Sequence, residues 1–168
     1  MSKFLLKVLS VTHWTDTLFS FQIERPKDFK FKSGEFVMIG LPNSDKPILR
    51  AYSICSPSWD EKLEFYSIIV ENGPLTSKLK NIKINDEIIL MSKSTGTLIL
   101  DALKPAKRLF LFSTGTGFAP FSSIIRDPET YDKFEKIILT HTCRFKNELH
   151  YSEKIISECI NNEMLKSF

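Results

Sequence analysis

The stretch "RLFLFSTGTGFAPFSSIIRDP" (residues 108–128) decides the fold of this 168-residue chain. Residues 108–113 form a continuous apolar run, which is typical of a strand that is buried on both faces of a parallel sheet. A glycine-rich turn follows, after which Phe118, Phe121 and Ile125 recur at helical spacing until Asp127 and Pro128 end the helix. The stretch therefore predicts a strand, a turn and a helix in that order.

The same order recurs once downstream. "KIILTHT" (136–142) predicts a second buried strand, and "NELHYSEKIISECI" (147–160) predicts a helix. The inner face of that helix is expected to carry Leu149, Ser152, Ile156 and either Cys159 or Ile160. Strand, helix, strand and helix in succession begin a parallel α/β sheet. Because two strands bury both faces of a sheet poorly, we expect this part either to be truncated or to be covered by another polypeptide.

The first hundred residues have a different pattern. Short segments of β-branched, aromatic or alternating residues are separated by turn formers: "LFSFQIE" (18–24), "EFVMIGL" (35–41), "RAYSICS" (50–56), "LEFYSIIV" (63–70), "EIILM" (87–91) and "STGTLIL" (94–100), with "PNSDKP" (42–47) as a loop. Many short strands at this spacing predict a small antiparallel barrel. The expected fold is a β barrel plus α/β, with residues 1–101 as the barrel and 102–168 as the α/β part.

Composition narrows the possible functions. The chain is 42% hydrophobic and 26% charged, with a net charge of +3. That charge is too weak to suggest nucleic acid, although a mildly basic face can steer an acidic protein partner. We expect no signal peptide and no membrane span. The three cysteines, Cys55, Cys143 and Cys159, are widely spaced. They indicate reduced thiols in the cytoplasm and no cysteine-ligated metal.

Two segments are candidates for phosphate binding. In "STGTG" (113–117), Gly115 and Gly117 are expected to take positive φ angles and to let a ligand approach the backbone. The helix start beyond them favours an anion, although a tight turn without a ligand fits equally well. In "NGPLTSKL" (72–79), Thr76 and Ser77 fall in the first turn of a short helix, where they fit either a phosphate site or simple N-capping.

The segment "RAYS" (50–53) supplies the remaining groups. Arg50 can bind phosphate oxygens in a bidentate way, Tyr52 can stack on a flat ring, and Ser53 can hydrogen-bond a ring edge. Strict alternation puts Arg50 and Tyr52 on one face of a strand and Ser53 on the other, so a bend or bulge is expected here. Together the motifs suggest a dinucleotide with a flat ring, plus a second nucleotide.

Five segments in order, "RAYSICSP", "LEFYSIIVENGPLTSKL", "TGTLILD", "LFSTGTGFAPFSSIIRDPE" and "ILTHTCR", resemble the bacterial type of ferredoxin (flavodoxin)–NADP(+) reductase. The resemblance covers essentially the whole chain. It implies an FAD-dependent oxidoreductase that exchanges hydride with NADP(H) and single electrons with ferredoxin or flavodoxin. The family continues with further strands and helices, so the resemblance implies an FAD site but only half of an NADP site. A flavin-binding electron-relay module and an oxygenase reductase component stay open as alternatives.

The resemblance also assigns roles to residues. In the barrel, Ser53 is the catalytic candidate near the flavin N5, where hydride arrives. The other FAD contacts that it implies are Arg50 on phosphate, Ala51 beside it, Tyr52 stacked on the isoalloxazine, Tyr66, Ser67 and Ile68 along the ring system, and Pro74, Leu75 and Thr76 at the pyrophosphate. In the α/β part it implies Thr116 between flavin and nicotinamide, Gly115 and Gly117 at the NADP pyrophosphate, and Cys143 and Arg144 near the 2′-phosphate.

Overall fold

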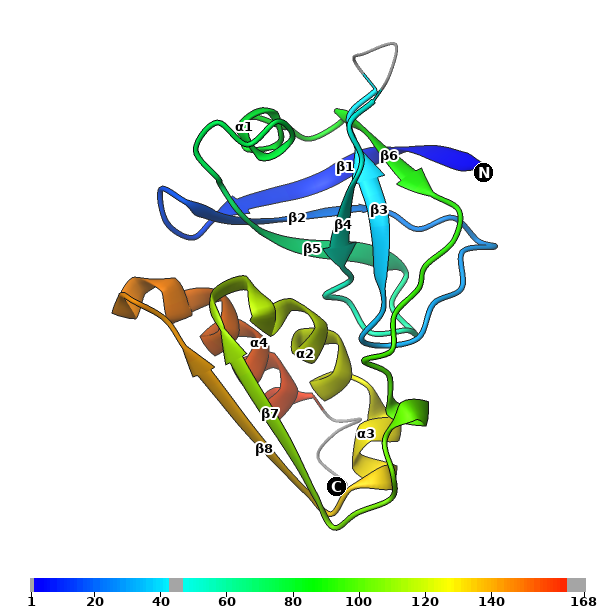
Figure 1. Cartoon of the computed structure of the whole chain (residues 1–168), viewed down its shortest axis with the longest axis vertical. Helices are drawn as coiled ribbons and strands as arrows, with labels where there is room; N and C mark the ends of the chain where they lie inside the picture. The colour runs from blue at the N-terminus through cyan, green and yellow to red at the C-terminus, as the bar shows by residue number, and fades with distance from the viewer. Residues whose placement is uncertain (1, 43–46, 163–168) are drawn as a thin grey trace.

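The computed structural model describes residues 2–42 and 47–162. The loop expected at 42–47 therefore lies, for residues 43–46, outside the described part. The N-terminal half is a six-stranded antiparallel sheet that curls into an incomplete barrel (Figure 1). The strands follow the order β4-β3-β6-β1-β2-β5 across the sheet. Their bounds are Lys3–His13 (β1), Leu18–Glu24 (β2), Phe36–Gly40 (β3), Arg50–Ser53 (β4), Lys62–Ile68 (β5) and Glu87–Met91 (β6).

Aromatic side chains fill the inside of the barrel. Phe19, Phe21 and Ile23 alternate along β2 and are completely or almost completely buried, as the spacing predicts. Phe21 lies 5.4 Å from the ring of Phe65 on β5. Between β5 and β6 the chain forms the four-residue helix α1 (Thr76–Leu79), which buries Leu79 in the same core. The barrel therefore has its own hydrophobic core.

The C-terminal half contains the expected parallel pair, β7 (Arg108–Thr114) and β8 (Lys136–Thr142), in register from Arg108–Lys136 to Thr114–Thr142. The glycine-rich segment is a 3₁₀ turn (Gly115–Gly117) that leads into α2 (Phe118–Ile125). Three further helical elements are α3 (Pro128–Lys133), a 3₁₀ turn at Lys146–Leu149 and α4 (His150–Asn161). A short 3₁₀ turn at Leu100–Ala102 lies between the two halves. None of the helices formed by the described residues combines the length and apolar character needed to cross a membrane.

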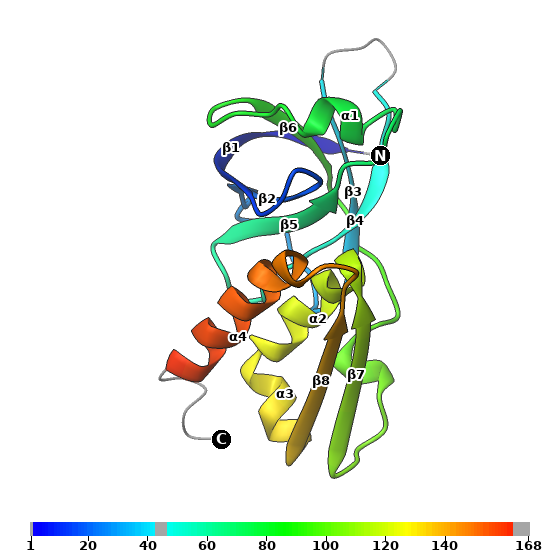
Figure 2. The same cartoon turned by 90° about the vertical axis from the view of Figure 1, so that its left-hand side faces the viewer.

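The β7–β8 pair departs from the expectation of burial on both faces. Figure 2 shows α2, α3 and α4 together on one side of the two strands. Leu109 and Leu111 of β7 are buried toward these helices, whereas Phe110 and Phe112 are 52% and 68% exposed. The continuous apolar run was therefore a wrong guide to burial, because no described residue covers the second face.

Two local predictions were also wrong, and one helix was missed. "STGTLIL" is not a strand; it contributes one isolated bridge, between Thr95 and Phe36. On α4 the buried residues are Tyr151, Ser152 and Ile155, while Ile156 and Ile160 are exposed, because the helix lies rotated from the expected face. Asp127 and Pro128 end α2 as expected, but Asp127 also caps a helix that was not predicted, α3, by accepting a hydrogen bond from the amide of Glu129.

Candidate functional site

A cavity of about 450 Å³ opens where the barrel meets the C-terminal half. Its walls come from β4, from β5, from the segment that leads into α1, and from the start of α2. Eleven of its lining residues were predicted from sequence: Arg50, Ala51, Tyr52, Ser53, Tyr66, Ser67, Ile68, Pro74, Leu75, Thr76 and Thr116. Sequence reasoning missed three others: Val70, Gly73 and Ala119. All three lie inside motifs that the sequence analysis quoted, so taking every residue of those motifs as a candidate would have included them.

The strand β4 brings the whole "RAYS" segment to the cavity without a bulge. Its pairing with β3 is regular, from Phe36–Ser53 to Ile39–Arg50, so the expected irregularity is absent from this ladder. β4 is the last strand of the sheet. All four residues of β4 line the cavity, together with Tyr66, Ser67 and Ile68 of β5 at the other end of the sheet.

Tyr52 links the two ends of the open barrel. Its hydroxyl lies 3.2 Å from the hydroxyl oxygen of Ser67 on β5, and its ring meets the ring of Phe65 edge-on at 6.3 Å. Burial raises the pKa of the Tyr52 phenol, against the opposing effect of the Ser67 hydrogen bond. The hydroxyl is therefore protonated at neutral pH, and the ring is held as a fixed wall of the cavity.

Tyr66 forms the opposite part of the wall. Its ring stacks on Tyr151 of α4, with 4.2 Å between centroids and 18° between planes. Burial is the main effect that raises the pKa of Tyr66, so this phenol also stays protonated. Among the described residues its buried hydroxyl finds no hydrogen-bond partner. A buried polar atom without a partner is costly.

The Thr76 side chain connects the start of α1 to Val70, just after β5. The Thr76 hydroxyl accepts a hydrogen bond from the amide of Val70 at 3.2 Å and lies 3.3 Å from the Val70 carbonyl. A β-carbon at Gly73 would lie only 2.3 Å from Thr76 Oγ1, so glycine is required at this turn. The helix has no side-chain cap, so N-capping, the alternative explanation of Thr76 and Ser77 in "NGPLTSKL", does not apply.

In the glycine-rich turn only one of the two glycines has the expected positive φ angle. Gly115 takes φ of +49°, as predicted. Gly117 takes φ of −61° because it already belongs to the helical turn that starts α2, so that prediction was wrong. A β-carbon at either glycine would meet nothing within 4 Å. The space beside both backbones is open to a ligand.

His141 on β8 holds this turn from behind. Its Nε2 lies 2.9 Å from the carbonyl oxygen of Gly115, and its Nδ1 lies 2.8 Å from the hydroxyl of Ser152 on α4. Because a carbonyl can only accept, Nε2 carries the proton. His141 is thus a structural residue that joins the turn to β8 and α4.

Cys143 and Arg144 lie beyond the end of β8. Neither of them lines the cavity, and neither do Gly115 and Gly117. Cys143 Sγ is 3.3 Å from His141 Nε2, but burial raises the pKa of the thiol, so the pair is not an activated nucleophile. The backbone amides of Arg144 and Phe145 both donate to the carboxylate of Glu148. Arg144 is exposed at a turn with a fixed backbone.

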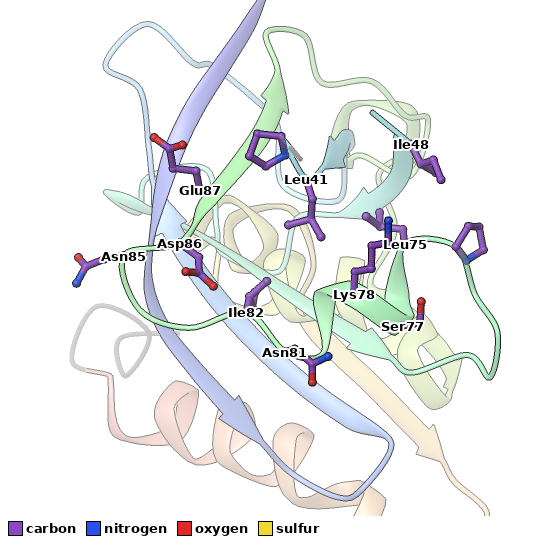
Figure 3. A pocket seen from close by; sticks show the side chains of 12 residues that line it. Leu41, Ile48, Leu75, Ser77, Lys78, Asn81, Ile82, Asn85, Asp86 and Glu87 are labelled. Atoms are coloured by element: carbon purple, nitrogen blue, oxygen red, sulfur yellow. The ribbon is translucent and has the colours of Figure 1, made fainter. Parts of the chain in front are cut away.

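A second cavity, of about 640 Å³, lies on the other side of α1 (Figure 3). Its lining includes Ser77 and Lys78 of α1, Asp86 just before β6 and Glu87 at the start of β6, all labelled in the figure. The two cavities share Pro74 and Leu75. The smaller cavity is the better candidate site, because it gathers the guanidinium, the aromatic rings and the contribution from the C-terminal half. Within the described ranges, no group of three or more His, Cys, Asp and Glu side chains is arranged to hold a metal ion.

Comparison with known proteins identifies the family. Residues 5–98 match the model of the oxidoreductase FAD-binding domain. The flavodoxin/ferredoxin–NADP reductase of Rhodobacter capsulatus is 58% identical over 150 residues, which are 89% of this chain and 56% of that protein. The ferredoxin–NADP reductase of Azotobacter vinelandii is 52% identical over 157 residues, 94% of this chain and 61% of that protein.

A solved structure gives the same result. The ferredoxin NADP⁺ reductase of Neisseria gonorrhoeae, with bound FAD and NADP, superimposes with a TM-score of 0.88 at 32% identity, over 92% of this chain and 63% of that one. The chain thus spans about three fifths of the length of these relatives. It belongs to the oxidoreductase FAD-binding domain family, as a homologue of the bacterial ferredoxin/flavodoxin–NADP reductases.

Proposed function

We propose that the 450 Å³ cavity binds FAD. The observation that carries the proposal is that Arg50 and Tyr52 of β4, Thr76 at the start of α1 and Thr116 before α2, which come from three separate segments, line one space. A guanidinium suits a phosphate, and a fixed aromatic ring suits the flat isoalloxazine. The open space beside Gly115 and Gly117, next to Thr116, leaves room for a ligand that extends from the cavity toward the C-terminal half.

Ten of the lining residues have a proposed role toward FAD. Arg50 binds an FAD phosphate, Tyr52 stacks on the isoalloxazine, and Ser53 lies near the flavin N5 as the catalytic residue. The remaining FAD contacts are Ala51 on the same strand, Tyr66, Ser67 and Ile68 along the ring, and Pro74, Leu75 and Thr76 at the pyrophosphate. The protein's part is to orient the ring and to exclude water, and bound FAD supplies the hydride and one-electron chemistry.

We further propose that the whole protein exchanges electrons between NADP(H) and ferredoxin or flavodoxin. The names of the relatives support this activity. Thr116 would separate flavin from nicotinamide. Gly115, Gly117, Cys143 and Arg144 would contribute to the NADP site, with Arg144 toward the 2′-phosphate. The net charge of +3 suits an acidic carrier, and a cytoplasmic location fits the family. We place the domain boundary between residues 101 and 102: the buried residues of the first hydrophobic cluster all precede it, while the second cluster joins Leu18, Cys55 and Tyr66 of the barrel to the C-terminal half.

An FAD titration of the purified chain tests the proposal. Wild type is expected to bind FAD and turn yellow. Arg50→Ala is expected to raise the Kd by about 10- to 100-fold, because a charge-assisted hydrogen bond is worth roughly 1.5–3 kcal/mol. Arg108→Ala, at an exposed arginine of β7, is the matched control and should leave the Kd unchanged. A wild-type chain that ignores FAD, or an unaltered Kd in Arg50→Ala, contradicts the assignment.

The electron-relay alternative makes a different prediction for the same sample. Four residues proposed for NADP lie outside the cavity lining, and the chain spans only part of its relatives. If this chain holds FAD but lacks a competent pyridine-nucleotide site, NADPH will not bleach the flavin absorbance near 450 nm. Bleaching by NADPH would favour the reductase.

A further inference from the structure

Arg126, directly after α2, forms an ion pair with Glu64 on β5 and so joins the C-terminal half to the barrel. Its side chain is only 12% exposed. Nη2 donates to the carbonyl oxygen of Cys55 at 2.6 Å and to the carboxylate of Glu64 at 3.0 Å, while Nε donates to the carbonyl oxygen of Ser122. The Glu64 side chain is 5% exposed. A buried guanidinium and a buried carboxylate are tolerated when each satisfies the other.

The partners of Arg126 on the barrel are continuous with the cavity wall. Cys55 lies two residues after Ser53, and Glu64 lies two residues before Tyr66. The amide of Cys55 also donates to the carbonyl oxygen of Glu64, so the two segments are joined to each other. Arg126 therefore contacts the same two segments that carry the rings and hydroxyls of the proposed FAD site.

Further hydrogen bonds come from the same end of α2. The hydroxyl of Ser122 donates to the carbonyl of Cys55, and that of Ser123 donates to the carbonyl of Ser56. The opposite end of the helix brings Thr116 and Ala119 to the cavity. An eight-residue helix is about 12 Å long. The side chains that hydrogen-bond α2 to the barrel lie at its C-terminal end, whereas its start is held by burial of Phe118 and by the His141 contact to the preceding turn.

We propose that Arg126 is a positioning residue. By joining α2 to the Cys55 carbonyl and the Glu64 carboxylate, it sets the distance between the Thr116–Ala119 wall and the Tyr66 wall. This role in holding the two halves does not depend on a cofactor. Its consequence for FAD affinity rests on the proposed function.

The test has a readout that needs no FAD. The indole nitrogen of Trp59 donates to the carbonyl oxygen of Arg126 at 3.1 Å, so Trp59 reports on this junction. The chain has one other tryptophan, Trp14, which Trp14→Phe removes in every variant. In this background the unfolding of the free protein is followed by Trp59 fluorescence and by circular dichroism at 222 nm. FAD binding is measured separately by titration.

In the Trp14→Phe parent the two unfolding curves are expected to coincide. Arg126→Gln should shift the Trp59 emission and separate the curves, and it should raise the FAD Kd by about tenfold through loss of preorganisation. Arg126→Lys should recover part of both effects, because one ammonium can reach only some of the acceptors. Arg108→Gln, on the exposed start of β7, is the control and should behave like the parent.

Arg126→Gln leaves a buried carboxylate unpaired and could unfold the protein for that reason alone. The double variant Arg126→Gln/Glu64→Gln removes both charges; it should fold and still show the shifted emission. Parental emission and coincident curves in the double variant overturn the proposal. If the parent binds no FAD, the proposed function fails, whereas the Trp59 readout still decides the role of Arg126.

Discussion

The barrel and the β7–β8 pair differ in how completely the apolar faces of their strands are covered. In the barrel, alternating side chains of β2 and β5 meet inside a closed aromatic core that includes Phe19, Phe21 and Phe65. In the β7–β8 pair, one face packs against α2 and α4, and the other exposes the stacked rings of Phe110 and Phe112. Apolar residues on a strand predict that a cover is favourable. They do not say which part of a polypeptide supplies it.

The largest expected difference between the two regions is in core stability. Phe65→Ala is expected to lower the free energy of unfolding by about 3–5 kcal/mol, because it leaves a cavity among fully buried rings. Phe112→Ala, at a ring that is 68% exposed, should change it by less than about 0.5 kcal/mol. Urea unfolding followed by circular dichroism measures both values. A large loss in Phe112→Ala would mean that this face is covered in solution.

Most of the fold followed from local pattern. Alternation identified β2, and the step from apolar run to glycine turn to helical spacing identified β7 and α2. These features depend on residues close together in sequence, so one sequence carries them. The exposure of Phe110 and the orientation of α4 depend on which element packs on which face, and periodicity alone does not fix that choice.

The candidate site divides in the same way. Arg50, Tyr52 and Thr76 lie in short motifs whose residue types suggest a phosphate and a flat ring, and the structure places them around one cavity. Arg126 and Glu64 gave no such signal. They are 62 positions apart, and an arginine or a glutamate on an amphipathic element reads as exposed until its partner is known.

The junction between the two regions should show an intermediate effect. The carboxylate of Asp127 accepts hydrogen bonds from the hydroxyls of Ser33 and Ser58 and from the amide of Glu129. Asp127→Ala removes the cap of α3 and takes away an acceptor of the buried Ser33 hydroxyl, so it should cost about 2 kcal/mol of unfolding free energy. Asp127→Asn keeps an acceptor and should cost less. Equal losses in the two variants would show that the carboxylate charge, rather than the hydrogen bonds, holds the junction.

The smallest expected effect is a pH dependence confined to the C-terminal half. Burial lowers the pKa of His141 below its ordinary value of 6.5, against the opposing effects of the Gly115 carbonyl and Glu148. Between the folded pKa and 6.5 the unfolded chain therefore binds more protons than the folded one, so stability rises with pH through this window. The free energy of unfolding should fall as the pH drops from 7.5 to 5, and the fall should be weaker in His141→Gln. Urea titrations at several pH values measure the difference, with His150→Gln, at an exposed position of α4, as the control. His13 of the barrel is exposed. If His13→Gln weakened the pH dependence of the free energy of unfolding as much as His141→Gln does, the pH dependence would not be confined to the C-terminal half.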